Sequence, residues 1–409
     1  MDRHIMDRRR FYSQIDSFWA DLYGEEYALY DVHLLERKEV EKIRLISERV
    51  GHIFFKAWRL LKEVPDRTFR EMGFPEEVFS FLRLETLQQA SVISRLDLIP
   101  YNNSYKCIEI NADTPTFIKE LFSTNAKVCA EFHVENPNAD MEEALRKAVR
   151  TAIQAAAKTS GKASPTVAFT AHDDNIEDKE TILYLLEISE TIGTYIPLHM
   201  LQIERGKGLF DVAGNQIDIL YRQTFPIENL ILDEDEEENK IGIWLLELVE
   251  QGKLSIINPP SAFLLQNKAV QAVIWSLHEE QHAFFTEEEH QWIENYFLPT
   301  YLEPDPFIER NTAYVKKPAF GREGDTVEIY KGSGKLSTAD PQQSYTDFLP
   351  VYQQYVEHPK APIKTEKGKQ EANLLVGSFL LNGKPSAIGF RAGGTITNNL
   401  SYYLPVGIR

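Results

Sequence analysis

The pattern of apolar and polar positions is most regular at residues 94–111, where two short alternating runs flank a turn rich in asparagine and serine. This pattern predicts a β-hairpin. Alternate residues of a strand point to one face, so Arg95 and Asp97 share a face of the first strand. Glu109 and Asn111 likewise share a face of the second strand. If the two strands pair across the turn, these four polar side chains converge.

The four converging side chains have the chemistry of a phosphoryl-transfer site. Two carboxylates and an amide oxygen, without histidine or cysteine, are typical ligands of Mg2+. A neighbouring guanidinium can form two parallel hydrogen bonds to a phosphate. Charged residues that alternate with apolar ones are also typical of the solvent-exposed face of an amphipathic strand. The spacing alone therefore leaves both interpretations open.

Apolar residues at helical spacing predict that residues 11–85 are mostly helical. An alanine-rich helix at residues 141–158 is expected to end at Gly161, because glycine readily adopts the left-handed conformation of a helix C-cap. Further helices are expected at residues 114–123, 176–192, 241–250 and 262–285.

Strands and helices alternate in the middle of the chain, which predicts an α/β layer with parallel strands. The strands of this layer are expected at residues 167–170, 194–201 and 217–221. Nearer the C-terminus, residues 357–372 are polar and are interpreted as an exposed connection. Further strands are expected at residues 312–330, around a glycine-rich loop, and at 349–356 and 374–380.

The chain has 409 residues, of which 43% are hydrophobic and 26% charged, as in a typical soluble globular protein. It has no apolar run of membrane-spanning length and no signal peptide, so no membrane partner is expected. Two cysteines, Cys107 and Cys129, are too few for a disulfide framework, which favours the cytoplasm. A formal net charge of −18 argues against a nucleic acid partner and is compatible with a cationic small substrate.

The segment His278-Glu279-Glu280-Gln281-His282 matches the HExxH motif of zinc metalloproteases. On the predicted helix, His278 and His282 would share a face, and Glu303 would be available as a third ligand. The surrounding segment is strongly acidic, whereas the helix of a zinc protease is normally packed in a core. A zinc metalloprotease is therefore kept as a remote alternative.

A glycine-rich loop follows Lys317, which lies at the end of a predicted strand. The loop contains Gly321, Arg322 and Gly324 and leads into the next predicted strand. Backbone N–H groups of such a loop, together with Arg322, can cover the phosphates of a nucleotide. Glycine-containing hairpins are common, so this segment indicates a nucleotide site only together with other evidence.

A series of motifs runs in one order across nearly the whole chain. The most specific is Glu109-Ile110-Asn111-Ala112-Asp113-Thr114-Pro115-Thr116. The others are Arg95-x-Asp97, Asn258-Pro259-Pro260 with Leu265-Gln266-Asn267-Lys268-Ala269, Leu298-Pro299-Thr300-Tyr301-Leu302, Lys317-Pro318-x-x-Gly321-Arg322-Glu323-Gly324, Val376-Gly377-Ser378 and Ile396-Thr397-x-Asn399-x-Ser401. In these motifs the chain resembles the ligase domain of the glutathionylspermidine synthase family, in its stand-alone form without the amidase domain.

This resemblance implies an α+β, ATP-grasp-like fold with a helical N-terminal part (residues 1–85). A magnesium-site hairpin and an α/β substrate region (86–257) would precede the ATP-grasp nucleotide-binding region (258–409). The implied activity is that of an ATP- and Mg2+-dependent ligase. Such an enzyme joins a small-molecule carboxylate to an amine, polyamines included, through an acyl-phosphate intermediate.

The resemblance also implies a role for each residue that matches a family motif. The magnesium ligands would be Asp97, Glu109 and Asn111. The catalytic residues would be Arg95, which matches the arginine that stabilises the transferring phosphoryl group, and Arg322, which matches the arginine of the lid loop. The nucleotide would be bound by Lys268, Lys317, Gly321, Arg322, Gly324, Gln354 and Tyr355. The substrates would be bound by Glu177 and Asp178, on the amine side, and by Arg391, near the carboxylate.

The sequence departs from the family pattern at two places near the C-terminus. Ala392-Gly393-Gly394 follows Arg391, where the family usually has acidic residues, and Tyr402 to Val406 replaces an Arg-Phe-Val-Pro-His pattern. These departures concern the substrates rather than the ATP site. They leave open a nucleotide-binding protein of the same fold without ligase turnover, and they leave the acid, the amine and the oligomeric state unidentified.

Overall fold

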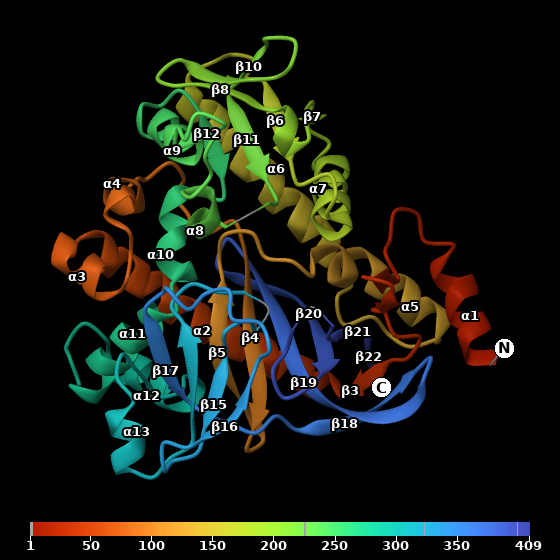
Figure 1. Cartoon of the computed structure of the whole chain (residues 1–409). Helices are drawn as coiled ribbons and strands as arrows, with labels where there is room; N and C mark the ends of the chain where they lie inside the picture. Colours follow the sequence, from red (N-terminus) through yellow and green to blue (C-terminus); the bar gives the residue numbers. More distant parts are fainter. Residues whose placement is uncertain (1–2, 225, 323, 399) are drawn as a thin grey trace.

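The computed structural model describes residues 3–409 apart from Phe225, Glu323 and Asn399. Three sheets dominate these residues: a parallel sheet, a large antiparallel sheet, and a second antiparallel sheet whose strands lie between residues 300 and 354. Figure 1 shows the parallel sheet at the top of the view and the antiparallel sheets below it. Glu323 and Asn399, which belong to two of the sequence motifs, lie outside the described residues.

The large sheet is built around the predicted hairpin, which is confirmed. Its strand order is β21-β20-β19-β4-β5, and β18 also pairs with β19. The strands are β4 (Ile93–Tyr101), β5 (Ser104–Asn111), β18 (Lys360–Thr365), β19 (Gly368–Leu381), β20 (Lys384–Gly393) and β21 (Tyr402–Leu404). Helix α2 (Arg37–Lys62) packs on β19 and β20 through one apolar stripe, because its buried apolar residues recur at helical spacing.

The parallel sheet confirms the predicted α/β layer. Its order is β12-β11-β6-β7, and every neighbouring pair is parallel. The strands are β6 (Val167–Thr170), β7 (Thr194–Tyr195), β11 (Ile219–Arg222) and β12 (Ser255–Ile257). A small antiparallel sheet is inserted between β7 and β11 and consists of β8 (Gln202–Glu204), β9 (Gly208–Phe210) and β10 (Gln216–Ile217). The helices of this part are α6 (Met141–Ser160), α7 (Ile176–Ser189), α8 (Ile227–Leu230) and α9 (Ile241–Glu250).

The side chain of Asn258, directly after β12, joins the parallel sheet to the hairpin. Its Oδ1 accepts a hydrogen bond from the Val92 amide at 2.7 Å, and its Nδ2 donates to the Asp113 carbonyl at 2.6 Å. The same Nδ2 lies 3.1 Å from the carbonyl oxygens of Ile93 and Ala112. This buried side chain therefore holds together the start of β4 and the segment that follows β5, where the predicted site lies.

The second antiparallel sheet has the order β13-β17-β14-β15-β16. Its strands are β13 (Thr300–Tyr301), β14 (Tyr314–Pro318), β15 (Glu328–Tyr330), β16 (Leu336–Ala339) and β17 (Pro350–Gln354). The strand, glycine loop and strand that the sequence predicts at residues 312–330 are thus confirmed. The nearby helices are α10 (Phe263–Gln266), α11 (Ala269–Glu279), α12 (Glu287–Tyr296) and α13 (Asp305–Glu309).

The prediction that residues 11–85 are mostly helical is wrong between Tyr12 and α2. Helix α1 ends at Tyr12, and short strands follow it. The cause is the fully buried Arg8, whose guanidinium donates to the Ala28 carbonyl at 2.8 Å and to Asp21 at 2.7 Å. These bonds fold the chain back on α1. The elements are α1 (Arg3–Tyr12), β1 (Asp21–Leu22), β2 (Glu25–Glu26), β3 (His33–Leu35), α3 (Asp66–Glu71), α4 (Phe79–Leu82) and, pairing with β3, β22 (Val406–Ile408).

Three other predicted elements differ from the structure. The strand expected at 194–201 ends at Tyr195, close to Pro197, which has no N–H to donate to a strand. The helix expected at 114–123 begins only after Phe117, which has a φ of 79°, and passes through a π-helical turn before α5 (Asn125–Glu131). Residues 357–372 are not an irregular connection, because β18 pairs there with the first half of β19.

None of the helices that the structure describes is long and apolar enough to cross a membrane. The two large hydrophobic clusters extend across the predicted boundaries at residues 85 and 257. That division of the chain stays a prediction.

Candidate functional site

The register of the hairpin brings the predicted polar side chains together. Asp97 pairs with Glu109, and Arg95 pairs with Asn111, with a bulge directly after Asp97. Asn102 and Asn103, between the two strands, both have positive φ, which is the backbone that a two-residue hairpin turn requires. All four side chains line one pocket.

Arg95 and Asp97 form a buried ion pair on the floor of this pocket. The Arg95 Nε lies 2.7 Å from Asp97 Oδ1, and its Nη2 lies 3.1 Å from Asp97 Oδ2. Nη1 donates to the Thr116 carbonyl at 2.9 Å. Burial raises the pKa of Asp97, and the guanidinium opposes this shift. Both side chains are almost fully buried, and these hydrogen bonds fix their orientation.

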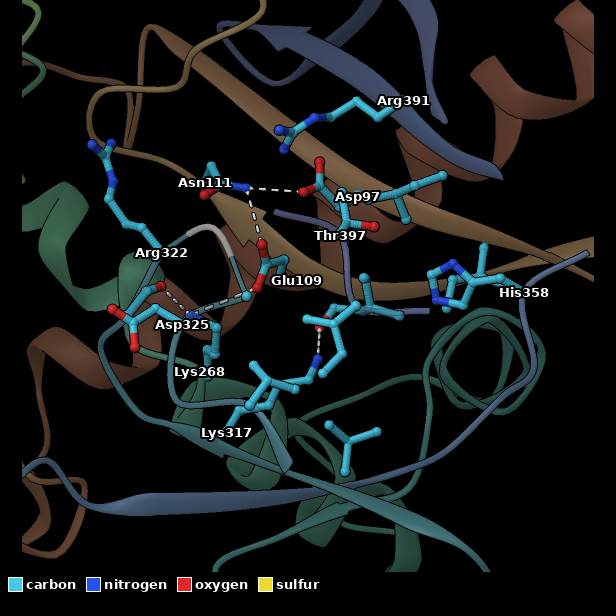
Figure 2. Close-up of a pocket in the computed structure, with 18 of the residues that line it drawn as sticks. Asp97, Glu109, Asn111, Lys268, Lys317, Arg322, Asp325, His358, Arg391 and Thr397 are labelled. Atoms are coloured by element: carbon cyan, nitrogen blue, oxygen red, sulfur yellow. Dashed lines mark hydrogen bonds and ion pairs between the residues drawn. The ribbon is translucent and has the colours of Figure 1, made fainter. Parts of the chain in front are cut away.

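Glu109 is held ionised although it is partly buried. Burial raises its pKa, but Lys268, Lys317 and Arg95 outweigh that effect and lower the pKa to about 2. Its contacts are long: Lys268 Nζ lies 3.6 Å from Oε2, and Asn111 Nδ2 lies 3.5 Å from Oε1. Asn111 Nδ2 is also 3.4 Å from Asp97 Oδ2. Figure 2 shows these three oxygen-bearing side chains side by side.

Lys268 reaches the pocket because the helix predicted at residues 262–285 is interrupted. Helix α10 ends at Gln266 and α11 begins at Ala269. Asn267 causes the break: its Oδ1 accepts a hydrogen bond from the Ala269 amide, and its Nδ2 donates to the Met72 carbonyl, both at 2.8 Å. The Lys268 ammonium donates to the Gly321 carbonyl at 2.7 Å. It therefore links the hairpin carboxylate to the glycine-rich loop.

Lys317, near the end of β14, approaches Glu109 from the other side. Its ammonium donates to Gln353 Oε1 at 2.8 Å and lies 3.3 Å from the Ile108 carbonyl. Burial lowers the pKa of Lys317 to about 8, with Glu109 opposing and Lys268 reinforcing the shift. In Figure 2 both lysines point towards the Glu109 carboxylate. The pocket thus holds an excess of buried positive charge beside the hairpin.

The glycine-rich loop covers one side of the pocket, and Arg322 and Gly324 help Lys268 to place it. The Arg322 Nη2 donates to Thr114, to its carbonyl at 2.8 Å and its hydroxyl at 2.9 Å. Gly324 has a φ of 74°, and an added Cβ would lie 2.5 Å from Ile396 Cγ2 and 2.7 Å from the Thr397 carbonyl. Only glycine fits there without displacing the chain. Gly321, Arg322 and Gly324 all line the pocket, as predicted.

The far end of the pocket is apolar. Ile99, Leu298, Val356 and Leu375 form a small buried cluster there, and all four line the pocket. The predicted residues Gln354 and Tyr355 line the same end. This composition suits the flat ring of a nucleobase, because ligand pockets combine apolar walls with a few placed polar groups.

His358 also lines this end, and sequence reasoning missed it. Burial, with the charge of Lys317, lowers its pKa to about 4, so the ring is neutral near pH 7. Its Nδ1 is buried and has no hydrogen-bond partner among the described residues. A polar atom of this kind is available to a ligand.

The predicted substrate residues are only partly brought together. Glu177, near the start of α7, and Arg391, on β20, both line the pocket. The Arg391 Nη2 donates to the Asn398 carbonyl at 2.9 Å. Asp178 does not line the pocket, and its amide is bound by the helix cap Asn175. The pocket wall here also contains Ile396 and Thr397 of the last sequence motif, and residues that sequence reasoning missed: Leu22, Tyr23, Tyr27, Asp325 and Thr395.

The family model described as "glutathionylspermidine synthase preATP-grasp" matches residues 7–409. The chain belongs to this family. The α+β, ATP-grasp-like fold is also that of a glutathione synthetase-like effector from Globodera pallida in its apo form. That structure superimposes with a TM-score of 0.59 at 13% identity and covers 99% of this chain and 96% of that one.

Two relatives of this chain have names that state an activity. A putative acid–amine ligase from Haemophilus influenzae is 24% identical over 333 residues, which cover 78% of this chain and 75% of that protein. The trypanothione synthetase of Crithidia fasciculata is 24% identical over 356 residues, which cover 82% of this chain. The match spans 50% of the length of the trypanothione synthetase.

The remote alternative, a zinc site with His278 and His282 on one face of a helix, is wrong. Helix α11 ends at Glu279, and Gln281 adopts a left-handed conformation that turns the chain away before His282. His278 instead lies 3.2 Å from the His290 ring and 3.0 Å from Glu294. The described residues hold no group of three or more His, Cys, Asp and Glu side chains suited to a metal ion.

Proposed function

We propose that this chain is an ATP- and Mg2+-dependent acid–amine ligase that forms an amide through an acyl phosphate. The family and the names of the two relatives support an acid–amine ligase of the glutathionylspermidine and trypanothione synthetase type. The observation that carries the finer proposal is one pocket in which Asp97, Glu109 and Asn111 face Lys268 and Lys317. Oxygen ligands beside two ammonium groups match a metal–polyphosphate complex in charge and chemistry.

The side chains present fit a magnesium ion. Glu109 is ionised, and the polar contacts of its carboxylate with Asn111 and Lys268 are 3.5 Å or longer, so its oxygens are available to a cation. Asn111 directs Nδ2 to both carboxylates, and rotation of the amide would present Oδ1 instead. Asp97, Glu109 and Asn111 would hold the ion, which would neutralise charge on the phosphate oxygens.

The remaining residues have complementary tasks in this proposal. Lys268 and Lys317 would bind the phosphates of ATP. The apolar end of the pocket, with His358, would bind its adenine ring. Arg95, held by Asp97, would stabilise the phosphoryl group during its transfer to the acid. Arg322 and the glycine-rich loop would exclude water, which otherwise hydrolyses an acyl phosphate. Arg391 would bind the acid, and Glu177 the amine.

A turnover assay tests this proposal and the alternative of a nucleotide-binding protein without turnover. The purified chain would be incubated with MgATP, a panel of acids that includes glutathione and γ-glutamyl peptides, and a panel of amines that includes spermidine. We expect ADP release and amide formation that require one acid and one amine together. Binding of MgATP without product from any pair would favour the alternative, which the departures after Arg391 motivate.

The affinity for MgATP is expected to fall as the pH rises through about 8, because Lys317 then loses its charge. The loss of one charge-assisted contact weakens binding roughly tenfold between pH 7 and pH 9. Glu109, whose pKa is about 2, faces the same ammonium group and stays charged over this range. Calorimetric titration at several pH values measures the effect. The Lys317→Arg variant, which keeps its charge, should show a flatter profile, and equal slopes in both proteins would contradict this role.

A further inference from the structure

Tyr27 and Glu120 form a buried pair at the substrate end of the pocket. The Tyr27 hydroxyl donates to Glu120 Oε1 at 2.6 Å. Tyr27 lines the pocket, between the N-terminal strands and Arg391, whereas Glu120 is fully buried behind it. The second oxygen of Glu120, Oε2, is buried and has no hydrogen-bond partner among the described residues. A carboxylate left in this state is costly for the fold, so a functional reason is expected.

The backbone around Glu120 is unusual. Glu120 opens a π-helical turn, Glu120–Thr124, and Phe117 just before it has a φ of 79°. Single π-turns and left-handed non-glycine residues are both found preferentially at functional sites. The Tyr403 hydroxyl donates to the Glu120 carbonyl at 3.1 Å and holds the widened turn in place. The left-handed Phe117 and the π-helical turn thus place the Glu120 side chain against Tyr27.

The electrostatics suit a group that accepts a proton. Burial raises the pKa of Glu120, with the Tyr27 hydroxyl, its own amide, Arg391 and Arg95 opposing. Burial, then Glu120 and Glu177, raises the pKa of Tyr27 well above its usual value, so the phenol keeps its proton at rest. The pair at rest is therefore a phenol that donates to a carboxylate of increased basicity.

We propose that Tyr27 and Glu120 take the proton of the attacking amine, an inference that rests on the proposed ligase function. As the amine nitrogen forms the C–N bond, the acyl C–O bond breaks and phosphate leaves with its electron pair. The proton on nitrogen passes to the Tyr27 oxygen while the Tyr27 proton passes to Glu120 Oε1. The proton later returns through the hydroxyl to solvent. Tyr27 touches the amine, and Glu120 acts through it.

The test separates amide formation from the earlier phosphorylation of the acid. Hydroxylamine traps an acyl phosphate as a hydroxamate and, as a weakly basic nucleophile, needs little help from a base. Wild type, Tyr27→Phe and Glu120→Gln would be assayed with MgATP and the acid and amine that wild type couples fastest. We expect both variants to lower kcat for amide formation by about 10²-fold, with the KM for the amine and hydroxamate formation little changed.

The chain offers a matched control and a competing acceptor. The Tyr30 hydroxyl makes the same 2.6 Å bond to Glu131, at an exposed position outside the pocket. Tyr30→Phe should leave both rates unchanged. Glu177→Gln should raise the KM for the amine rather than lower kcat, since Glu177 is placed as a binding group.

Three outcomes would overturn the assignment. Equal loss of amide and hydroxamate in the variants would mean that the pair only shapes the pocket. Unchanged amide formation would mean that another group takes the proton. Wild type that binds MgATP but forms neither product would contradict the ligase function itself, and this result is distinct because no variant is needed to see it. Thermal melting and MgATP affinity verify that Tyr27→Phe and Glu120→Gln are folded.

Discussion

Replacement of Glu109 by glutamine is expected to lower ligation by roughly 10³-fold. The Glu109 carboxylate lies 3.6 Å from the Lys268 ammonium, and the charges of Lys268 and Lys317 both act on it. Its removal takes away a charged magnesium ligand. A 10³-fold loss corresponds to about 4 kcal/mol of charge stabilisation in the transition state. The rate of ADP release with the acid and amine present measures it.

Glu143→Gln is the control for this prediction. Glu143 is an exposed acid on α6 that contacts Arg146 and does not line the pocket. The same change of charge there should leave ligation within about twofold of wild type, because surface ion pairs contribute little. A Glu109 variant with wild-type turnover would show that magnesium, if used, binds elsewhere.

The second large effect is expected on stability, from Asp113→Asn. Asp113 Oδ1 forms an ion pair with Arg222 at the end of β11, and both side chains are almost fully buried. Its Oδ2 accepts a hydrogen bond from the Ile227 amide at 3.0 Å. The substitution removes the carboxylate charge that faces the buried guanidinium, and breaking a buried ion pair in this way costs about 3–5 kcal/mol. Urea denaturation followed by tryptophan fluorescence measures the shift.

A matched exposed pair shows whether burial is the cause. Glu135→Gln breaks the contact of Glu135 with Arg37, in which both side chains are more than half exposed. Its effect on the denaturation midpoint should be much smaller than that of Asp113→Asn. Equal effects of the two variants would contradict the argument that the Asp113 pair locks the Asn111–Thr116 segment onto the parallel sheet.

The hairpin could be predicted from sequence because its signals are local. Alternation fixes which side chains share a face along each strand, and Asn102 with Asn103 fixes the turn and the pairing next to it. The parallel layer was predictable for a similar reason, since strand and helix patterns alternate along the chain. The pairing of Asp97 with Glu109 could not be predicted, because the turn alone would place Asp97 opposite Ile108. The bulge after Asp97 shifts the register by one residue and brings Glu109 opposite Asp97, and it has no signal in the sequence.

The missed features depend on distant contacts. The interruption before Lys268 is set by Asn267, which bonds to the carbonyl of Met72 on another element. Tyr27 enters the pocket wall only because Arg8 folds the N-terminal strands back. Glu120 looks like an ordinary helical residue in the sequence, and its role in the structure depends on a π-turn. None of these contacts is encoded by the spacing of residues.

The most direct measurement is calorimetric titration of ATP, with and without Mg2+, into wild type and Glu109→Gln. The account predicts saturable binding to wild type that requires Mg2+ and is strongly weakened in the variant. This result would place the nucleotide beside the hairpin and leave the identity of the acid and amine as the next question. Absence of binding to wild type under either condition, or equal binding to both proteins with and without Mg2+, would contradict it.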